Sequence, residues 1–319
     1  MTISLAHIQT LRNAFGEQLQ VNVSLKRYTA ARIGGKADVM ITVETLVELA
    51  KVTKTLWELA IPFMILGSGS NVLISDAGVR QVVVLNRAKK IIFNPQSLHP
   101  TVWVESGVNF GALARQAATH GLSGLEWAAG IPGTVGGAVY GNAGAHGSDM
   151  SDILVMAKIL HLMQTNGDNQ HEILQEDWTV DRLEYAYRGS SIKRQPGRVV
   201  VLSAQLRLSQ STPEAVQTKM DKYSEMRRSS QPTGASLGSI FKNPPGDYAG
   251  RLIEAAGLKG KKIGKVEISQ KHANFFINQD SATASDYAAL IRLVRQEVIN
   301  KFGISLELEI EMLGDWMDR

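Results

Sequence analysis

The chain has 319 residues, of which 44% are apolar and 20% charged, the composition of an ordinary soluble globular protein with enough length for about two domains. Its 34 basic residues against 30 acidic ones leave a net charge of +4 that is spread along the chain, which favours a small anionic ligand and argues against a nucleic-acid-binding protein. Cysteine is absent, so disulfides, thiolate nucleophiles and cysteine-based metal sites are excluded.

The N-terminal residues predict neither export nor membrane insertion. Ser4, His7, Gln9 and Arg12 interrupt the apolar positions at the start of the chain, whereas a signal peptide needs a continuous apolar stretch. No run in the sequence approaches the roughly eighteen apolar residues of a membrane helix. We therefore expect a cytoplasmic protein with no membrane partner.

The region from residue 37 to about residue 208 predicts short strands joined by a few helices. Apolar runs broken by glycine indicate strands, and a 3.6-residue apolar period indicates helices. Strands are expected at 37–43, 62–66, 81–85, 101–105, 153–162 and 199–208, and helices at 45–59 and 110–120. The pattern indicates an α+β fold.

Helices dominate the following region, from about residue 210 to residue 303. Thr212 is the predicted N-cap of a helix that starts at Pro213 and ends near Arg228, because proline is favoured in the first helical position. Further helices are expected at 248–256 and 284–302, each followed by glycine. Residues 304–312 then alternate apolar and polar side chains, which predicts a strand with one polar face.

A first glycine-rich loop, Gly67-Ser68-Gly69-Ser70-Asn71, directly follows the predicted strand 62–66. The uncovered backbone amides of such a loop can bind phosphate. A Rossmann dinucleotide site would need a third glycine at position 72 and then a helix. Val72 stands there instead, and the chain leads into the predicted strand 81–85, so the Rossmann interpretation fails.

A second loop has seven glycines within residues 130–147. It begins Gly130-Ile131-Pro132-Gly133-Thr134-Val135-Gly136-Gly137-Ala138 and continues through Asn142. Glycine costs backbone entropy, so this density indicates a backbone pressed against a bulky group or forced into positive φ angles. Tight turns alone would also explain either loop. The second loop lacks the lysine of a P-loop, which argues against an ATPase.

Taken together, the two loops resemble those of the UDP-N-acetylenolpyruvoylglucosamine reductase family. The segment at 29–37, Thr-Ala-Ala-Arg-Ile-Gly-Gly-Lys-Ala, is also similar to a family signature, and the resemblance runs from about Leu25 to Gly314. It implies a two-lobed FAD-binding domain of the vanillyl-alcohol-oxidase type with a smaller α/β substrate domain. We expect the first over 1–209, with lobes at about 1–85 and 86–209, the second over 210–303, and a C-terminal strand over 304–319 that returns to the flavin.

The resemblance also implies a reaction and its ligands. The family reduces the enolpyruvyl ether of UDP-N-acetylglucosamine to UDP-N-acetylmuramate with NADPH, for peptidoglycan synthesis, and binds FAD without a covalent link. The expected partners are therefore the UDP-sugar and NADPH. The FAD contacts that it implies are Gly67, Ser68, Gly69, Ser70, Asn71, Gly133, Thr134, Gly136, Gly137, Ala138 and Asn142.

Three residues match the catalytic positions of the family. Arg188, in Tyr-Arg-Gly-Ser, corresponds to the arginine beside the substrate carboxylate, which a guanidinium suits. Ser239, in Gly-Ser-Ile-Phe-Lys-Asn-Pro, corresponds to the proton donor, and a hydroxyl can suffice for a strongly basic enolate. Glu309 corresponds to a glutamate at the flavin, although the pattern alone makes Glu307, Glu309 and Glu311 equivalent members of a solvated face.

The resemblance gives the substrate contacts less exactly. Asn243 is expected to contact the substrate, and Arg227 and Arg228 lie near the expected position of the UDP pyrophosphate. Ser229 and Ser230 depart from the family pattern there, so a solvated helix end remains an alternative for either arginine. The seven histidines show no metal-ligand spacing, and no metal is predicted.

Other functions remain alternatives at this point. A sugar or alcohol oxidase of the same superfamily would share the glycine loops but lack the motifs around Ser239 and Glu309. A non-catalytic nucleotide-binding protein would not need Arg188, Ser239 and Glu309 together. Only Ile192 and Lys193 separate Ser191 from the Arg-Gln-Pro-Gly run that starts at residue 194, so the chain resembles the family branch without an inserted tyrosine loop.

Overall fold

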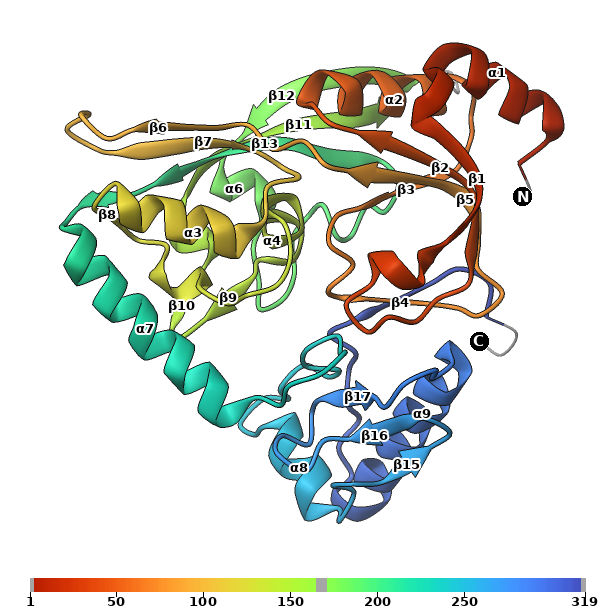
Figure 1. The fold of residues 1–319 in the computed structure, drawn as a ribbon, viewed down its shortest axis with the longest axis vertical. Coiled ribbons are helices and arrows are strands. Elements are labelled where there is room, and N and C mark those ends of the chain that lie inside the picture. Colours follow the sequence, from red (N-terminus) through yellow and green to blue (C-terminus); the bar gives the residue numbers. More distant parts are fainter. Residues whose placement is uncertain (1–2, 165–170, 317–319) are drawn as a thin grey trace.

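The computed structural model describes residues 3–164 and 171–316. Two lobes lie beside each other, a third region lies below them in this view, and one long helix joins the second lobe to the third region (Figure 1). No helix within the described ranges has the length and apolar character needed to cross a membrane.

The first lobe is built on a four-stranded sheet with the order β1-β2-β5-β3. Its elements are α1 (Leu5–Phe15), β1 (Leu19–Ser24), β2 (Lys36–Val43), α2 (Leu46–Glu58), β3 (Phe63–Leu66), β4 (Val72–Ile74) and β5 (Val79–Asn86), with 3₁₀ turns at Gly16–Gln18 and Leu25–Tyr28. β2 and β3 both run parallel to β5, and β1 is antiparallel to β2. Leu11 of α1 and Leu49 and Leu56 of α2 are fully buried against this sheet. The predicted strands and the predicted helix of this lobe are confirmed to within two residues at each end.

The second lobe is built on a five-stranded sheet with the order β12-β11-β13-β7-β6. Its strands are β6 (Ile91–Asn94), β7 (Thr101–Glu105), β8 (Leu122–Ser123), β9 (Gly144–Ala145), β10 (Ser148–Asp149), β11 (Leu154–Gln164), β12 (His171–Trp178), β13 (Val199–Arg207) and β14 (Ser209–Gln210). Its helices are α3 (Phe110–Thr119), α4 (Val135–Gly141), α5 (Met150–Ile153) and α6 (Val180–Leu183), with a 3₁₀ turn at Glu126–Ala128. Neighbouring strands of the five-stranded sheet are antiparallel. The expected strands and helix are confirmed as β7, β11, β13 and α3, whereas the other strands and helices of this lobe were not predicted.

The second glycine loop contains a helix that the sequence did not predict. α4 starts after Thr134, whose side-chain oxygen accepts a hydrogen bond from Gly137 N at 3.3 Å. A Cβ atom at Gly136 would lie 2.9 Å from Cβ of Ser106. The glycine therefore lets the first turn of α4 approach the segment around Ser106 closely. Packing and the N-cap therefore outweigh the low helix propensity of the glycines.

The third region follows the bridging helix α7 (Pro213–Ser230) and contains α8 (Ala249–Ala255), β15 (Lys262–Ile263), β16 (Val266–Ile268), β17 (Phe276–Asn278) and α9 (Ala284–Phe302). Thr212 caps α7, as predicted, by accepting a hydrogen bond from Ala215 N at 3.2 Å. α9 has the predicted bounds and packs Leu290, Val294 and other apolar residues into the core of this region. Asp76 of the first lobe accepts hydrogen bonds from the first backbone amides of α9, which joins the two parts.

The predicted continuous strand at 304–312 is wrong. Only β18 (Glu311–Leu313) is a strand, and it runs parallel to β4. Residues 304–310 form no ladder apart from one isolated bridge between Leu308 and Phe241. The alternation has another cause, because Leu306 and Ile310 are buried in the core of the third region while the segment crosses towards the first lobe. A C-terminal strand was also expected over 304–319, and its last residues, 317–319, lie outside the described residues.

Candidate active site

The first glycine loop, between β3 and β4, has a conformation that requires glycine at position 69. Gly69 has a φ of +59°, and a Cβ atom there would lie 2.0 Å from the carbonyl oxygen of Tyr28. Ala30 N donates a hydrogen bond to Gly69 O at 2.9 Å, which holds the loop in place. The backbone amides of Ser68, Gly69 and Ser70 have no hydrogen-bond partner among the described residues. Such amides are available to an anionic ligand.

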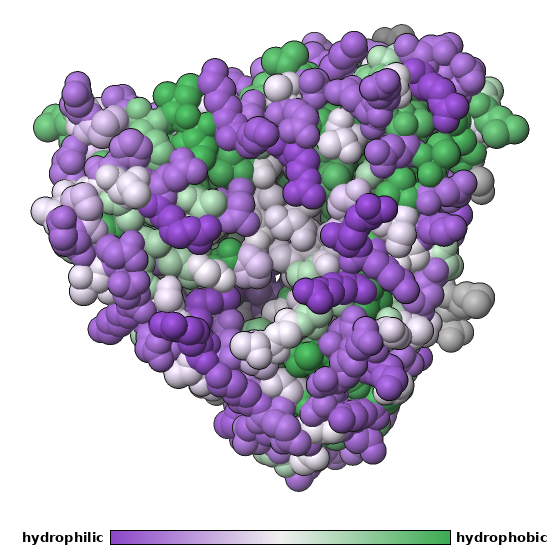
Figure 2. Space-filling model, in the orientation of Figure 1, coloured by the Kyte–Doolittle hydropathy of each residue, from purple (hydrophilic) through white to green (hydrophobic). Residues whose placement is uncertain are grey.

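The second glycine loop lies directly against the first. A Cβ atom at Gly67 would lie 2.6 Å from Thr134 Oγ1, and one at Gly133 would lie 3.1 Å from Ser70 Oγ. Both glycines therefore permit a contact that a larger residue would prevent. The loops form one surface of backbone where the two lobes meet. The space-filling view shows a recess near the middle of this face of the molecule (Figure 2).

Two predicted cofactor contacts, Ala138 and Asn142, lie inside the protein. Ala138 is 5% exposed and Asn142 is 4% exposed. Nδ2 of Asn142 donates to Asp149 Oδ2 at 3.2 Å and to Ala186 O at 3.3 Å, while its Oδ1 accepts from Ser151 N at 3.1 Å. Because these bonds use both amide hydrogens and one acceptor site of the oxygen, the Asn142 side chain positions the loop.

Arg188 and Glu309, which are far apart in the sequence, form an ion pair. Arg188 Nε donates to Glu309 Oε1 at 2.6 Å, and its Nη2 donates to Gly144 O at 3.0 Å. The two side chains are 25% and 18% exposed. Arg188 has a φ of +55°, an uncommon conformation for a residue with a side chain, which the surrounding contacts must hold in place. The structure therefore brings together two of the three predicted catalytic residues.

The three glutamates of the C-terminal segment have different environments. Glu307 is 78% exposed and pairs with Lys242 at 3.3 Å, whereas Glu311 is 28% exposed and pairs with Lys193 at 3.2 Å. Burial raises the pKa of Glu309, and the positive charges of Arg188, Lys193 and Lys242 act in the opposite direction. The polar face expected to be solvated is thus partly buried, and only tertiary contacts distinguish Glu309 from its neighbours.

Ser239 lies beside the backbone of Glu309. Glu309 N donates to the carbonyl oxygen of Ile240, the residue after Ser239, at 2.9 Å. The Ser239 hydroxyl has no hydrogen-bond partner among the described residues. Asn274, which is 3% exposed, holds this segment through its side chain, which bonds both the N–H and the carbonyl oxygen of Phe241. The sequence analysis missed this role of Asn274.

Asn71 connects the first glycine loop to the same cluster. Its Nδ2 donates to Glu309 O at 3.1 Å, and its backbone oxygen accepts from Glu311 N at 2.9 Å. The predicted cofactor loop and the predicted catalytic glutamate are therefore in direct contact.

The predicted substrate residues differ in their surroundings. Arg228 is 74% exposed and pairs with Glu225 at 2.7 Å. Arg227 has no carboxylate partner among the described residues, and its Nε would lie 3.5 Å from a Cβ atom at Gly130 of the second glycine loop. Burial lowers the pKa of Arg227. Asn243 Oδ1 accepts a hydrogen bond from Ala249 N at 3.1 Å. Its amide oxygen therefore binds the first backbone N–H of α8.

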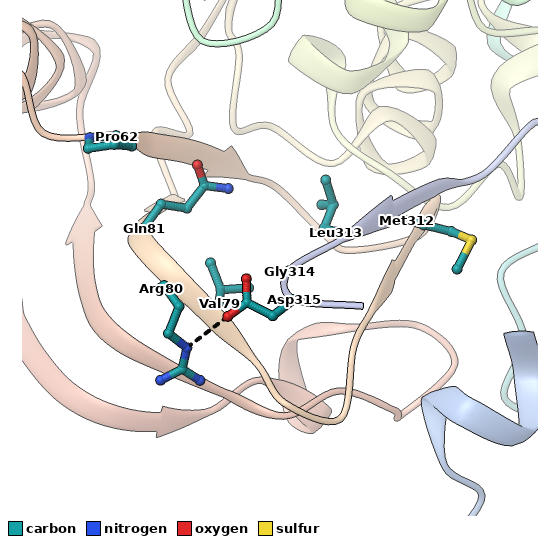
Figure 3. Close-up of a pocket in the computed structure, with 8 residues that line it drawn as sticks. All are labelled: Pro62, Val79, Arg80, Gln81, Met312, Leu313, Gly314 and Asp315. Atoms are coloured by element: carbon teal, nitrogen blue, oxygen red, sulfur yellow. Dashed lines mark ion pairs between the residues drawn. The ribbon is translucent and has the colours of Figure 1, made fainter. Parts of the chain in front are cut away.

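Two further cavities lie outside the cluster of Arg188, Ser239 and Glu309. One, of about 250 Å³, lies between the start of β5 and the C-terminal segment, with Arg80 and Asp315 paired at its edge (Figure 3). The other, of about 680 Å³, is lined by Lys26, Arg27, Thr29, Ala30 and Arg32. No group of three or more metal-ligating side chains with a suitable arrangement occurs within residues 3–164 and 171–316.

The fold and the glycine loops define an FAD-binding protein. A family model for an FAD binding domain matches residues 37–168, and the model for the C-terminal domain of UDP-N-acetylenolpyruvoylglucosamine reductase matches residues 230–313. The two-lobed FAD-binding fold that was expected is confirmed. This chain belongs to the UDP-N-acetylenolpyruvoylglucosamine reductase family.

Relatives support this assignment along nearly the whole chain. The UDP-N-acetylenolpyruvoylglucosamine reductase of Rubrobacter xylanophilus is 38% identical over 309 residues, which cover 97% of this chain and 99% of the relative. That of Geobacillus kaustophilus is 40% identical over 292 residues, or 91% of each chain. The crystal structure of the reductase from Thermus caldophilus has a TM-score of 0.75 at 35% identity and covers 92% of this chain.

Proposed function

We propose that the protein uses FAD and NADPH to reduce UDP-N-acetylglucosamine enolpyruvate to UDP-N-acetylmuramate, a precursor of peptidoglycan. The observation that carries the proposal is the contact between the two loops and the side-chain cluster. Asn71 joins the first glycine loop to Glu309 at 3.1 Å, and Glu309 holds Arg188 at 2.6 Å. A cofactor on the loops would therefore lie beside a guanidinium and a carboxylate.

The loop residues fit a bound dinucleotide cofactor. Amides of Ser68, Gly69 and Ser70 have no partner within residues 3–164 and 171–316 and can donate to a pyrophosphate, and Gly67 and Gly133 leave the surface without side chains. We assign the FAD contacts to these residues and to the backbone near Thr134 and Gly137. When bound, the flavin would accept a hydride from NADPH and deliver it to the substrate.

The side chains of the cluster supply the remaining steps. Arg188 is suited to hold the enolpyruvyl carboxylate and to stabilise the negative charge that develops beside it during hydride addition. Glu309 fixes the orientation of the guanidinium through its ion pair. Ser239, next to the backbone contact of Glu309, can then donate a proton to the enolate carbon. Arg227, which has no carboxylate partner in the described part of the chain, is the better candidate for a UDP phosphate than the paired Arg228.

The experiment that tests this function separates the two half-reactions. The purified protein should show the absorption spectrum of an oxidised flavin, which NADPH should bleach and the UDP substrate should restore in stopped-flow measurements without oxygen. Because both substrates would use one site, initial rates should give parallel double-reciprocal lines. A flavin-free protein that cannot be reconstituted, or a flavin that the UDP substrate does not reoxidise, would contradict the proposal.

A further inference from the structure

A second ion pair lies next to the pair of Arg188 and Glu309. Lys193 Nζ is 3.2 Å from Glu311 Oε1, and the two side chains are only 23% and 28% exposed. Lys193 and Arg188 come from one segment, and Glu311 and Glu309 come from another. The two segments are therefore joined by two parallel charge pairs, of which the proposed mechanism uses only one.

Tyr140 of α4 completes this second pair. Its hydroxyl donates to Glu311 Oε2 at 3.3 Å, and Lys193 Nζ is 5.9 Å from the centre of its ring. Burial, followed by the charge of Glu311, raises the pKa of Tyr140, so the phenol keeps its proton and remains a donor. Glu311 is thus held by a cation on one oxygen and by a hydroxyl on the other.

The backbone connects the same residues to the segment of Arg188. Ser190, which is 0% exposed, donates its hydroxyl hydrogen to Tyr140 O at 2.6 Å and accepts from Lys193 N at 3.1 Å. The segment at 188–193 is consequently fixed to α4 by Ser190 and to the C-terminal segment by Lys193.

A partly buried ion pair contributes little to stability on its own, because removing two charges from water offsets their attraction. Oε1 of Glu311 also has no hydrogen bond of good geometry despite its distance of 3.2 Å from Lys193. An arrangement of this kind at a candidate active site is better explained by its effect on neighbouring groups. Lys193 has such an effect, since its charge acts on Glu309.

We propose that Lys193, held by Glu311 and Tyr140, is a positioning residue for the pair of Arg188 and Glu309. It fixes the segment that carries Arg188 and places a second positive charge beside Glu309. The inference rests on the proposed function for its kinetic consequence, but its electrostatic consequence is independent of any substrate.

The test compares lysine-to-methionine variants at two lysines of similar exposure, Lys193 and Lys158. Lys193→Met should slow flavin reoxidation by the UDP substrate about tenfold, as expected for neighbours that act together, while bleaching by NADPH and FAD content stay close to wild type. Lys193→Arg should recover most of the rate. Lys158→Met is the matched control, because Lys158 is 33% exposed and pairs with Asp177 at 2.8 Å on the second-lobe sheet. It should have no effect on either half-reaction.

A titration of Glu309 distinguishes positioning from general stabilisation. The charged groups around Glu309 are Arg188, Lys193, Lys242, Glu307 and Glu311. Removing the positive charge of Lys193 disfavours the carboxylate, so the pKa of Glu309 should rise in Lys193→Met and stay near wild type in Lys193→Arg and Lys158→Met. The measurement is the carboxyl carbon resonance in NMR, assigned with Glu309→Gln.

Three results would overturn the inference. These are an unchanged pKa of Glu309 in Lys193→Met, an unchanged reoxidation rate, or an equal loss of FAD and of both half-reactions, which would indicate a structural role only. If the wild-type protein did not react with the UDP substrate, the proposed function would fail, and the titration alone would still decide whether Lys193 acts on Glu309.

Discussion

The two glycine loops and the cluster of Arg188, Ser239 and Glu309 lie against each other but are built from different chemical groups. The loops present backbone amides and owe their shape to glycines, such as Gly69, that leave no room for a side chain. The cluster presents side chains from three segments, and its groups are oriented by ion pairs and backbone contacts. Amides suit a cofactor of constant shape, whereas side chains can respond to a change of charge during a reaction.

Because the loops and the cluster use different chemical groups, we expect substitutions to impair flavin binding and the reaction separately. A substitution in the cluster should change the reaction and leave flavin binding intact. A substitution in the loops should lower flavin binding first and affect the reaction only through the loss of cofactor.

The largest effect is expected at Ser239. Ser239→Ala removes the hydroxyl with little change in volume, so FAD content and bleaching by NADPH should be nearly unchanged. Flavin reoxidation by the UDP substrate should slow about 10²–10⁴-fold, the usual contribution of a positioned general acid. Ser239→Cys should recover part of the rate, because a thiol can donate a proton. Reoxidation of Ser239→Ala at the wild-type rate would assign the proton to another donor.

Glu309 and Glu307 provide a matched pair within one segment. Glu309→Gln should lower the reoxidation rate about 10²-fold, as for the loss of one preorganised electrostatic group. Glu307→Gln should be close to wild type, because Glu307 is 78% exposed and exposed ion pairs contribute little. Single-turnover measurements of flavin absorbance give the reoxidation rate of each variant. Equal mild losses would mean that burial of Glu309 has no catalytic consequence.

A substitution of Gly69 tests the loops. Gly69→Ala should weaken FAD binding about tenfold or more and lower the melting temperature, because its Cβ would lie 2.0 Å from Tyr28 O at a φ of +59°. Gly16→Ala is the control, since Gly16 has a φ of +53° with no atom within 4 Å. Flavin titration of the apoprotein measures the FAD affinity, and thermal unfolding measures the melting temperature. If both variants lose FAD alike, the contact with Tyr28 is not the cause.

The smallest effect distinguishes the adjacent arginines of α7. Arg227→Met should raise the KM for the UDP substrate about tenfold with little change in kcat, because the lost contact with a phosphate would be present throughout the reaction. Arg228→Met should leave the KM near wild type, since Arg228 is paired with Glu225 and 74% exposed. Steady-state kinetics at low salt are the measurement. A larger change in Arg228→Met than in Arg227→Met would reverse the assignment of the phosphate contact.

Elements with strong local signals were predictable from the sequence. The helix at Ala284–Phe302 has an apolar stripe, a cap at Thr283 and a terminal glycine, and strands β2, β3 and β5 of the first lobe have apolar runs. Such signals act between residues close in the chain. The family resemblance also implies that Arg188, Ser239 and Glu309 share one site, and the ion pair of Arg188 and Glu309 agrees with this.

Tertiary structure decided the features that local patterns leave equivalent. Glu307, Glu309 and Glu311 alternate identically, and only Glu309 meets Arg188, 121 positions away. The segment at 304–310 alternates like a strand yet forms no continuous ladder, because its apolar side chains fill a core contributed by other elements. Asn142 is committed to internal hydrogen bonds, and Lys193 gains its role only through Glu311 and Tyr140. Local sequence determines backbone preferences and periodicity, but burial and charge pairing depend on which distant segments the fold brings together.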